Sequence, residues 1–338
     1  MKRFPYRTMV ALVALLSISC VHEYPDGAGT DPTAIQTQIT LKTQTTFTHS
    51  SILAGLNKEE YGYMYFVVEL HKDAFGETPL LRREIGVPRA ADGSATITLN
   101  ETLHAGNYKC IAYATPAKAA DGSGRIFSLK DLEAISYEGE YPGSTDAKEC
   151  YEIRFDLPLS ADKWFDTHES THLLESPMGS IEIISADAEE FIKLEIARLE
   201  SLKQQQSGES RADWQWSDYY VVWSFNMYHP VGYNAYTGLP NKAEQAVNFH
   251  SGITPQNEKE ASVGFDYVFV NGSQSQVNLT LQIYDKNNTL LNVYSGIEVP
   301  IERGKTTIVR GEYLTNRKES GIGIDPEFDG DITIVLPD

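Results

Sequence analysis

The stretch Leu103-His104-Ala105-Gly106-Asn107-Tyr108 is the segment of this chain that points most directly to a fold. It has the form L-x-x-G-x-Y and enters a predicted strand, which is typical of a tyrosine corner. In such a corner the glycine permits a tight turn, and the phenol hydrogen-bonds back to the backbone across a Greek-key arch. Leu103, Gly106 and Tyr108 therefore predict a structural corner of a β-sandwich, without a catalytic role.

Segments with period-two alternation and many β-branched or aromatic residues lie on both sides of this corner, separated by turn residues. Such alternation predicts β-strands. In the first half the predicted strands are Ile35–Phe47, Tyr61–Leu70, Leu80–Val87, Ala95–Leu99, Asn107–Tyr113 and Tyr151–Leu157. In the second half they are Asp218–Tyr228, Phe265–Val270, Val277–Tyr284, Leu290–Val293, Thr306–Tyr313 and Asp331–Leu336.

One segment, from about Asp187 to Gln206, has the apolar spacing of an amphipathic helix. Ser185 and Asp187 are suitable N-caps, acidic residues occupy the first turn, and Gly208 follows the end. The predicted fold class is therefore mainly β. It consists of two tandem Greek-key β-sandwiches, at residues 35–173 and 174–338, with the helix near the start of the second.

The N-terminus predicts a bacterial lipoprotein signal at residues 1–19. Basic residues are followed by the apolar stretch Met9–Ile18, which is too short to span a bilayer, and then by Cys20. Ser17 departs from the lipobox, where leucine is usual, so a cleaved secretory signal without a lipid is the alternative. Acylation of Cys20 would tether the mature protein to a membrane surface outside the cytoplasm, through a flexible segment at residues 20–34, which is rich in glycine and proline.

The 338 residues carry a formal net charge of −19. This acidity argues against partners such as nucleic acid or anionic lipid head groups. Cys110 shares the predicted inner face with Tyr108, whereas the alternation from Tyr151 to Phe155 leaves Cys150 on the outer face. A disulfide between opposite faces requires local distortion, so two free thiols are the preferred expectation.

The pentapeptide from His168 to His172 has the form H-E-x-x-H. In zinc peptidases this spacing works because a helix places both imidazoles on one side of the metal. Here polar residues precede the motif and Pro177 soon follows it, which is a poor setting for a buried helix. A solvated loop is the preferred interpretation, and a zinc site at His168 and His172 remains a distant alternative.

Aromatic residues supply a second candidate site. Within 214–228 the odd positions Tyr219, Val221, Trp223, Phe225 and Met227 predict a core-facing row, and the even positions Trp214, Trp216, Tyr220 and Tyr228 fall on the other face. Exposed aromatic rings beside polar groups can stack on sugar rings, so these four residues are a candidate glycan site. Packing against the helix or the other domain is the competing and preferred interpretation.

Five segments of the second half, taken in order, resemble a known family. They are Leu174–Glu182, the predicted loop Tyr228–Pro240, Phe265–Val270, Val299–Gly311 and Ile324–Asp331. Together they resemble the fimbrillin-like surface lipoproteins of the Bacteroidales, in the superfamily of type V pilus stalk, anchor and tip subunits. The resemblance implies two transthyretin-like β-sandwiches and a role in assembling or anchoring adhesive fimbriae, without catalytic residues or a cofactor.

Two departures indicate which kind of subunit this is. The Arg-Pro usual at the domain boundary is Ser176-Pro177 here. Stalk subunits of the superfamily mature when a trypsin-like protease removes the lipidated first strand, but Arg82 and Arg83, the first arginines after Cys20, lie inside a predicted strand. An anchor or accessory subunit that keeps its lipid and its first strand is therefore expected.

The predicted first strand would be a working part of such a subunit. Its odd-numbered face carries Ile35, Ile39 and Leu41 together with Thr37, Thr43 and Thr45, and we expect this face to cover the core of the first sandwich. Other fimbrial subunits would join through free sheet edges by β-augmentation.

Overall fold

The computed structural model describes residues 34–45, 47, 60–76, 78–163, 166–205, 214–317 and 331–335. Within these ranges the chain forms five sheets and one α-helix, so the predicted mainly-β class with a helix near the start of the second half is confirmed. The predicted signal, Cys20 and the tether as far as residue 33 lie outside the described residues.

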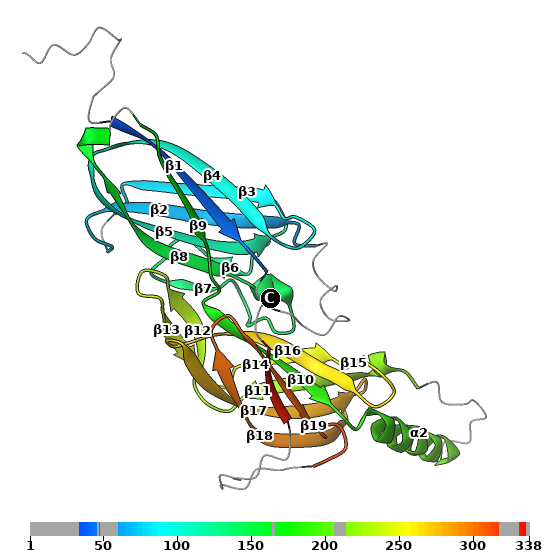
Figure 1. Cartoon of the computed structure of the whole chain (residues 1–338). Coiled ribbons are helices and arrows are strands. Elements are labelled where there is room, and N and C mark those ends of the chain that lie inside the picture. The colour runs from blue at the N-terminus through cyan, green and yellow to red at the C-terminus, as the bar shows by residue number, and fades with distance from the viewer. Residues whose placement is uncertain are drawn as a thin grey trace, which may run out of the picture.

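The first half is a sandwich of two sheets (Figure 1). One has the order β3-β2-β5-β8 and the other the order β4-β1-β9, and all neighbours are antiparallel except the parallel pair β1 and β9. Side chains from both sheets form one core, which includes Ile39, Phe66 and Leu99. The strands are β1 (Ala34–Thr43), β2 (Tyr63–Lys72), β3 (Leu81–Pro88), β4 (Ala95–His104), β5 (Gly106–Ala117), β8 (Tyr151–Leu159) and β9 (His168–Leu173).

The second half is another sandwich, with sheets of order β15-β16-β10-β19-β20 and β14-β11-β17-β18. The indole of Trp223 is buried at its centre and donates to the carbonyl of Val263 at 2.9 Å. The strands are β10 (Met178–Ser185), β11 (Tyr219–Phe225), β14 (Asn248–Gly252), β15 (Thr254–Pro255), β16 (Ala261–Phe269), β17 (Gln274–Asp285), β18 (Leu290–Glu302), β19 (Thr306–Gly311) and β20 (Asp331–Val335).

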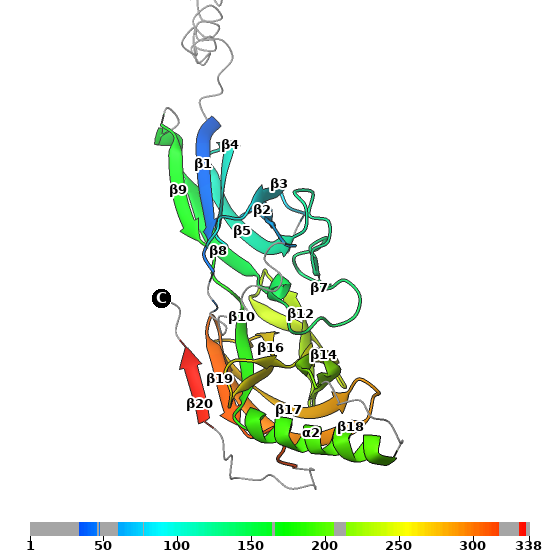
Figure 2. The same ribbon diagram turned by 90° about the vertical axis from the view of Figure 1, so that its right-hand side faces the viewer.

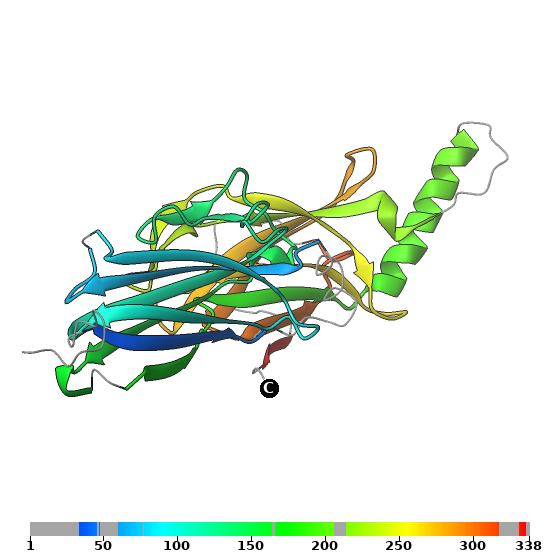
Figure 3. The ribbon, with the colours of Figure 1, turned by 90° about the horizontal axis from the view of Figure 1, so that it is seen from above.

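The helix α2 (Ala188–Gln205) projects from one end of the second sandwich (Figure 3). Its first turn is held because Ala188 and Phe191 are buried in the core of that sandwich. Farther along the helix, Leu194 and Leu202 are exposed. Contacts with the second sandwich continue to the middle of the helix, where buried Glu195 accepts a hydrogen bond from Tyr219 and Arg198 pairs with Asp285.

A fifth sheet lies between the two sandwiches and contains strands from both halves of the chain (Figure 2). Its order is β13-β12-β7-β6, from β6 (Phe127–Ser128), β7 (Ile135–Tyr137), β12 (His229–Asn234) and β13 (Leu239–Glu244). A third apolar cluster surrounds it and joins Tyr113 of β5 to Tyr233 and Phe269 of the second half. The expected boundary at residue 173 falls between β9 and β10; as a domain boundary it stays a prediction.

Two segments predicted as loops are strands. The pentapeptide from His168 to His172 lies in β9, and the segment Tyr228–Pro240 contains β12, a turn and the start of β13. In β9 the inward positions are His168, Ser170 and His172, which are all polar, so the sequence lacks the alternation of apolar and polar residues that predicts a strand. Pairing with β1 and with β7 supplies the backbone partners that local propensity does not predict.

Two side chains differ from the expectation. Cys150 lies on the outer face of the first sandwich, as predicted, but it is fully buried because the second half covers that face. Met227 was expected in the core, but β11 ends at Phe225 and 68% of Met227 is exposed. Cys110 and Cys150 lie in different apolar clusters and both are free thiols.

Candidate functional site

The first strand is the middle strand of its sheet and is paired along both edges. Every residue of β1 is in register with β4, from Ala34 opposite His104 to Thr43 opposite Ala95. On the other edge, Thr37–Lys42 runs parallel to β9. Removal of β1 would leave β4 and β9 without a neighbour between them, so the seat of β1 is a slot with two free edges.

The side chains of β1 close the core beneath that slot. Ile39 and Leu41 are fully buried and Ile35 is 1% exposed, all in the cluster that contains Leu99 and Leu103 of β4. The odd-numbered face also buries Thr37 and Thr43, as predicted from the alternation. A foreign strand in this slot would need large apolar side chains at the positions of Ile35, Ile39 and Leu41.

The corner predicted from the sequence joins the two sheets of the first sandwich. The Tyr108 hydroxyl donates to the carbonyl oxygen of His104 at 2.8 Å, and Ala105 alone connects β4 to β5, which belong to different sheets. Leu103 and Tyr108 pack in the same core, and the ring of Tyr108 covers Gly106. These contacts hold the chain where it crosses from the slot's sheet to the opposite one.

The residues of the H-E-x-x-H motif are separated by their strand geometry. Four residues along an extended strand place His168 and His172 about 13 Å apart, too far for one metal ion. The ring of His172 stacks on Phe155 with centroids 3.6 Å apart. Burial lowers the pKa of His172. Among the residues that the structure describes, no group of three or more potential metal ligands occurs.

The four predicted aromatics do not share a surface. Trp214 and Trp216 contact each other, with centroids 4.9 Å apart, and pack on the core beside Phe191 of the helix. Tyr220 stacks between His250 and Tyr284 on the outer face of its sheet, and its hydroxyl donates to Asn288 at 2.8 Å. Tyr228 alone is largely exposed, at 70%. The predicted shared face does not form because Trp214, Trp216 and Tyr228 lie outside β11, and Trp214 and Trp216 instead pack beside the helix, which was the preferred interpretation.

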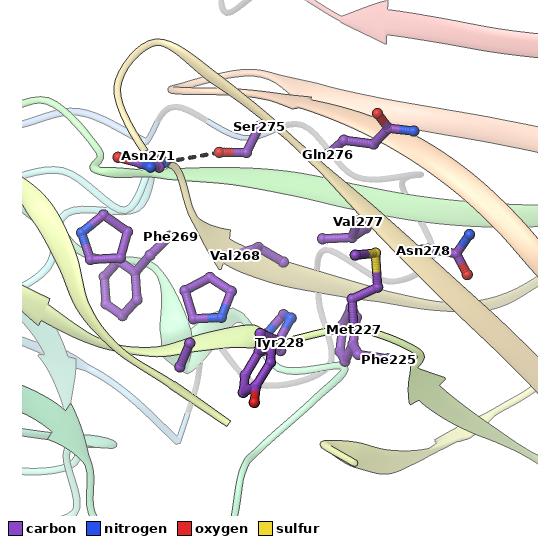
Figure 4. A pocket seen from close by; sticks show the side chains of 14 residues that line it. Phe225, Met227, Tyr228, Val268, Phe269, Asn271, Ser275, Gln276, Val277 and Asn278 are labelled. Atoms are coloured by element: carbon purple, nitrogen blue, oxygen red, sulfur yellow. Dashed lines mark hydrogen bonds between the residues drawn. The ribbon is translucent and has the colours of Figure 1, made fainter. Parts of the chain in front are cut away.

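Tyr228 lies at a pocket of about 260 Å³ in the second sandwich (Figure 4). No Asp, Glu, Lys or Arg lines it, although the chain is strongly acidic. Apolar walls come from Phe225, Met227, Pro230, Pro240, Ala243, Val268, Phe269 and Val277, and polar groups from His229, Asn271, Ser275, Gln276 and Asn278. Sequence analysis did not predict this pocket, because its lining comes from β11, β12, β13, β16, β17 and the turns next to them.

A buried polar cluster joins the two halves beneath this region, and sequence analysis missed it. The Lys148 ammonium, from the 3-10 turn η1 (Asp146–Lys148), donates to Asp266 Oδ1 of β16 at 2.5 Å and to the Tyr141 oxygen at 2.8 Å. The Tyr141 hydroxyl donates to Asp266 Oδ2 at 2.6 Å, and His229 Nε2 lies 2.7 Å from the same hydroxyl oxygen. The side chains of Lys148 and Asp266 are 0% exposed.

Burial shifts the pKa of all four side chains in this cluster. Desolvation lowers the pKa of Lys148 to about 8 although the Asp266 charge opposes the shift, and burial raises the pKa of Asp266 against the attraction of Lys148. Burial, with a smaller contribution from Lys148, lowers the pKa of His229 well below its usual value. Burial raises the pKa of Tyr141 well above its usual value, followed by the charge of Asp266. Both members of the ion pair are thus shifted toward their neutral forms.

A second ion pair crosses between the halves at the surface of the same interface. Arg303 donates to Glu152 Oε1 at 2.5 Å and to the carbonyl of Ser176 at 3.1 Å. Arg303 lies in the turn between β18 and β19 and so ties Ser176, at the junction of the two halves, to Glu152 of β8. The two sandwiches are therefore joined by apolar, buried ionic and partly exposed ionic contacts.

A family model described as a family of unknown function (DUF6562) matches residues 29–337. Comparison with curated proteins finds no match. Among the residues described, no helix has the length and apolarity needed to cross a membrane.

The chain is structurally similar to solved adhesins and fimbrial proteins of the Bacteroidales. A putative cell adhesion protein from Bacteroides ovatus is 11% identical with a TM-score of 0.46, and the match covers 90% of this chain and 96% of that one. The tip fimbrial protein Mfa3 from Porphyromonas gingivalis is 8% identical with a TM-score of 0.42, over 89% and 99%. A fimbrial assembly protein from Parabacteroides distasonis is 9% identical with a TM-score of 0.38, over 82% and 91%.

Proposed function

The chain belongs to the family of unknown function DUF6562, and for this member we propose a non-enzymatic role as a fimbrial subunit of anchor or accessory type. In this proposal Cys20 carries the lipid that holds the protein on the outer membrane, other fimbrial subunits join through free sheet edges, and the assembly supports adhesion. The support comes from the sequence resemblance and from the seat of the first strand.

The observation that carries the proposal is the position of β1. The strand that follows the predicted tether fills its own slot, with Ile39 and Leu41 fully buried and partners on both edges. A polymerising stalk subunit must lose this strand before a neighbour's strand can enter. In this chain Lys42 lies inside the slot, between Thr96 and Leu173, so cleavage at Lys42 requires β1 to leave the slot first. Lys58, between β1 and β2, lies outside the described residues.

The arginines of β3 are protected as well. Arg82 pairs with Glu69 and Glu84, and Arg83 makes a bidentate pair with Glu101. Cleavage at either would require β3 to detach from β2, with which it is paired along its whole length. A retained first strand favours an anchor or accessory subunit over a stalk subunit.

Attachment is tested with Cys20→Ala, expressed with its own signal. We expect a folded protein that is released from the outer membrane or mislocalised, because Cys20 lies in the predicted tether, before the first described strand. Melting temperature and membrane retention in high salt are measured together. Full retention of a normally folded Cys20→Ala protein would contradict the anchor role.

Partnership is tested by detergent extraction of the intact lipoprotein and identification of proteins that co-purify with it. An anchor or accessory subunit retains fimbrial subunits in complexes that resist SDS, because strand complementation dissociates slowly. Mild trypsin treatment is the matched test for a stalk subunit. A ladder of polymers after cleavage at Lys42 would replace the anchor assignment with that of a stalk pilin.

Glycan binding is the second candidate function, and one observation favours it. Tyr228 is 70% exposed at an uncharged pocket that also presents Asn271 and Asn278, and a ring with amides nearby suits a sugar. Glycan-array binding that is lost in Tyr228→Ala and kept in Tyr220→Ala, with no fimbrial partner, would favour this function. The double variant Trp214→Ala/Trp216→Ala is expected to lose stability first, because both indoles pack on the core.

A further inference from the structure

We propose that Lys148 and Asp266 condense to an intramolecular amide, joining Nζ to Cγ and linking the two halves of the chain covalently. The two residues are 118 positions apart and come from η1 and β16. The inference depends on the geometry of the buried cluster and is independent of the proposed fimbrial role.

The reacting atoms are already in contact. Lys148 Nζ lies 2.5 Å from Asp266 Oδ1 and therefore within van der Waals contact of the carboxyl group. Both side chains are 0% exposed, and they are held by elements that pack on opposite sides of the interface. Fixed contact of this kind gives an intramolecular reaction a large effective concentration. Exclusion of water removes the reactant that would hydrolyse the product.

The protonation states also suit condensation. An ammonium group has no lone pair and a carboxylate is a poor electrophile, so the reactive pair is the neutral amine with the carboxylic acid. Burial lowers the pKa of Lys148 to about 8 and raises the pKa of Asp266, which makes the neutral pair more accessible than in water. One proton moving from Nζ to the carboxylate produces it.

Tyr141 is placed to move the remaining protons. Its oxygen accepts from Lys148 Nζ at 2.8 Å and its hydroxyl donates to Asp266 Oδ2 at 2.6 Å, so it bridges the nucleophile and one carboxyl oxygen. His229 Nε2, at 2.7 Å, donates to the same oxygen when its proton is on Nε2. Because Tyr141 can accept one proton as it gives another, it can act without ionising.

The step balances without a further reactant. The Nζ lone pair forms the bond to Cγ of the carboxylic acid and gives a tetrahedral intermediate. Tyr141 accepts a proton from nitrogen and passes its own to Oδ2, and the Cγ–Oδ2 bond breaks as Oδ2 leaves as water. Oδ1 remains as the amide oxygen, and the chain has lost one molecule of water.

The test uses the full lipoprotein, purified from membranes, denatured, alkylated and digested with trypsin. Trypsin does not cut after an acylated lysine, so the bond predicts a branched peptide of residues 131–154 joined to residues 260–286, lighter by one water than the two together. Fragment spectra must place the link at Lys148 and Asp266. Recovery of the linear peptide that ends at Lys148, with no branched species, would overturn the proposal, as would a water loss that maps elsewhere.

The chain contains a matched internal control. Lys109 Nζ lies 2.6 Å from Asp156 Oδ1, but the two side chains are 37% and 74% exposed. We expect complete cleavage after Lys109 in the same digest. A branched peptide at this pair as well would show that contact alone suffices and would contradict the stated requirement for burial.

Two variants test the assignment of roles. Asp266→Ala must abolish the branched peptide, and its persistence would refute the assigned link. Tyr141→Phe keeps both reactants and removes the relay, so the yield of the branched peptide is expected to fall at least tenfold in protein whose circular dichroism is unchanged. A wild-type yield in folded Tyr141→Phe would overturn the relay.

Discussion

The burial of the first strand sets how much stability should be lost when its core side chains are truncated. Ile39 and Leu41 are fully buried in the core of the first sandwich, on the one strand that both β4 and β9 need as a neighbour. Truncation of a buried Ile or Leu to Ala costs about 2–5 kcal/mol, so Ile39→Ala/Leu41→Ala removes a large part of a domain's usual stability of about 5–15 kcal/mol. The double variant is expected to release β1 from its slot.

The matched control changes the same strand on its other face. Gln36 and Lys42 are exposed residues of β1, so Gln36→Ala/Lys42→Ala is expected to alter the free energy of unfolding by less than about 1 kcal/mol. Hydrogen exchange is the direct assay. Backbone amides of β4 and β9 that bond to β1 should lose protection in the core variant and keep it in the control.

A second experiment separates strand loss from general unfolding. A chain lacking residues 21–43 should aggregate or capture another strand, because two free edges and an apolar slot are exposed. A synthetic peptide of residues 34–43 should restore its melting temperature, and a peptide with Asn at positions 35, 39 and 41 should not. If the shortened chain stays monomeric with unchanged stability and no affinity for the peptide, the reasoning about the slot is refuted.

Three further predictions concern the corner, the histidine of the buried cluster and the thiols. Tyr108→Phe removes the hydrogen bond to the His104 carbonyl and should lower the free energy of unfolding by about 1 kcal/mol, measured by denaturant titration. Unfolded His229 takes up a proton at its usual pKa of 6.5 whereas burial lowers the folded-state pKa well below it, so stability should fall as pH drops below 6.5, by up to about 1.4 kcal/mol per pH unit. The variant His229→Gln should lose the larger part of this pH dependence, the remainder coming from His172, and the exposed His250→Gln should retain all of it. Burial raises the pKa of Cys110 to about 12 and also raises that of Cys150, so a thiol reagent should label neither residue until the protein is unfolded; rapid labelling of the native protein would contradict their burial.

The fold class and most strands of the first sandwich could be predicted because their signals are local. In β1 and β4 one face meets a core and the other meets solvent, so apolar and polar residues alternate along the chain. The helix was predicted for the same kind of reason, from residues three and four apart. Tyr108 and its acceptor His104 are four positions apart, so the corner can also be predicted from local sequence.

Predictions failed where another part of the chain decides the environment. The inward positions of β9 are polar, so its strand state depends on pairing with β1, about 130 residues earlier. Cys150 has the sequence pattern of an outward-facing residue, and it is buried because the second half packs on that face. Tyr228 and Trp214 are both at even-numbered positions, which would place them on the same face of one continuous strand. Because β11 covers only Tyr219–Phe225, both residues lie outside it and on different surfaces.

The class of fold, the helix, the corner and the apolar face of the first strand follow from local sequence, because each depends on residues that are close together along the chain. The contact between Lys148 and Asp266, the pocket beside Tyr228 and the sheet shared by both halves arise only from long-range packing. In isolation a lysine and an aspartate are ordinary surface residues. Their chemistry changes only when two packed halves exclude water from both, and no local pattern encodes that exclusion.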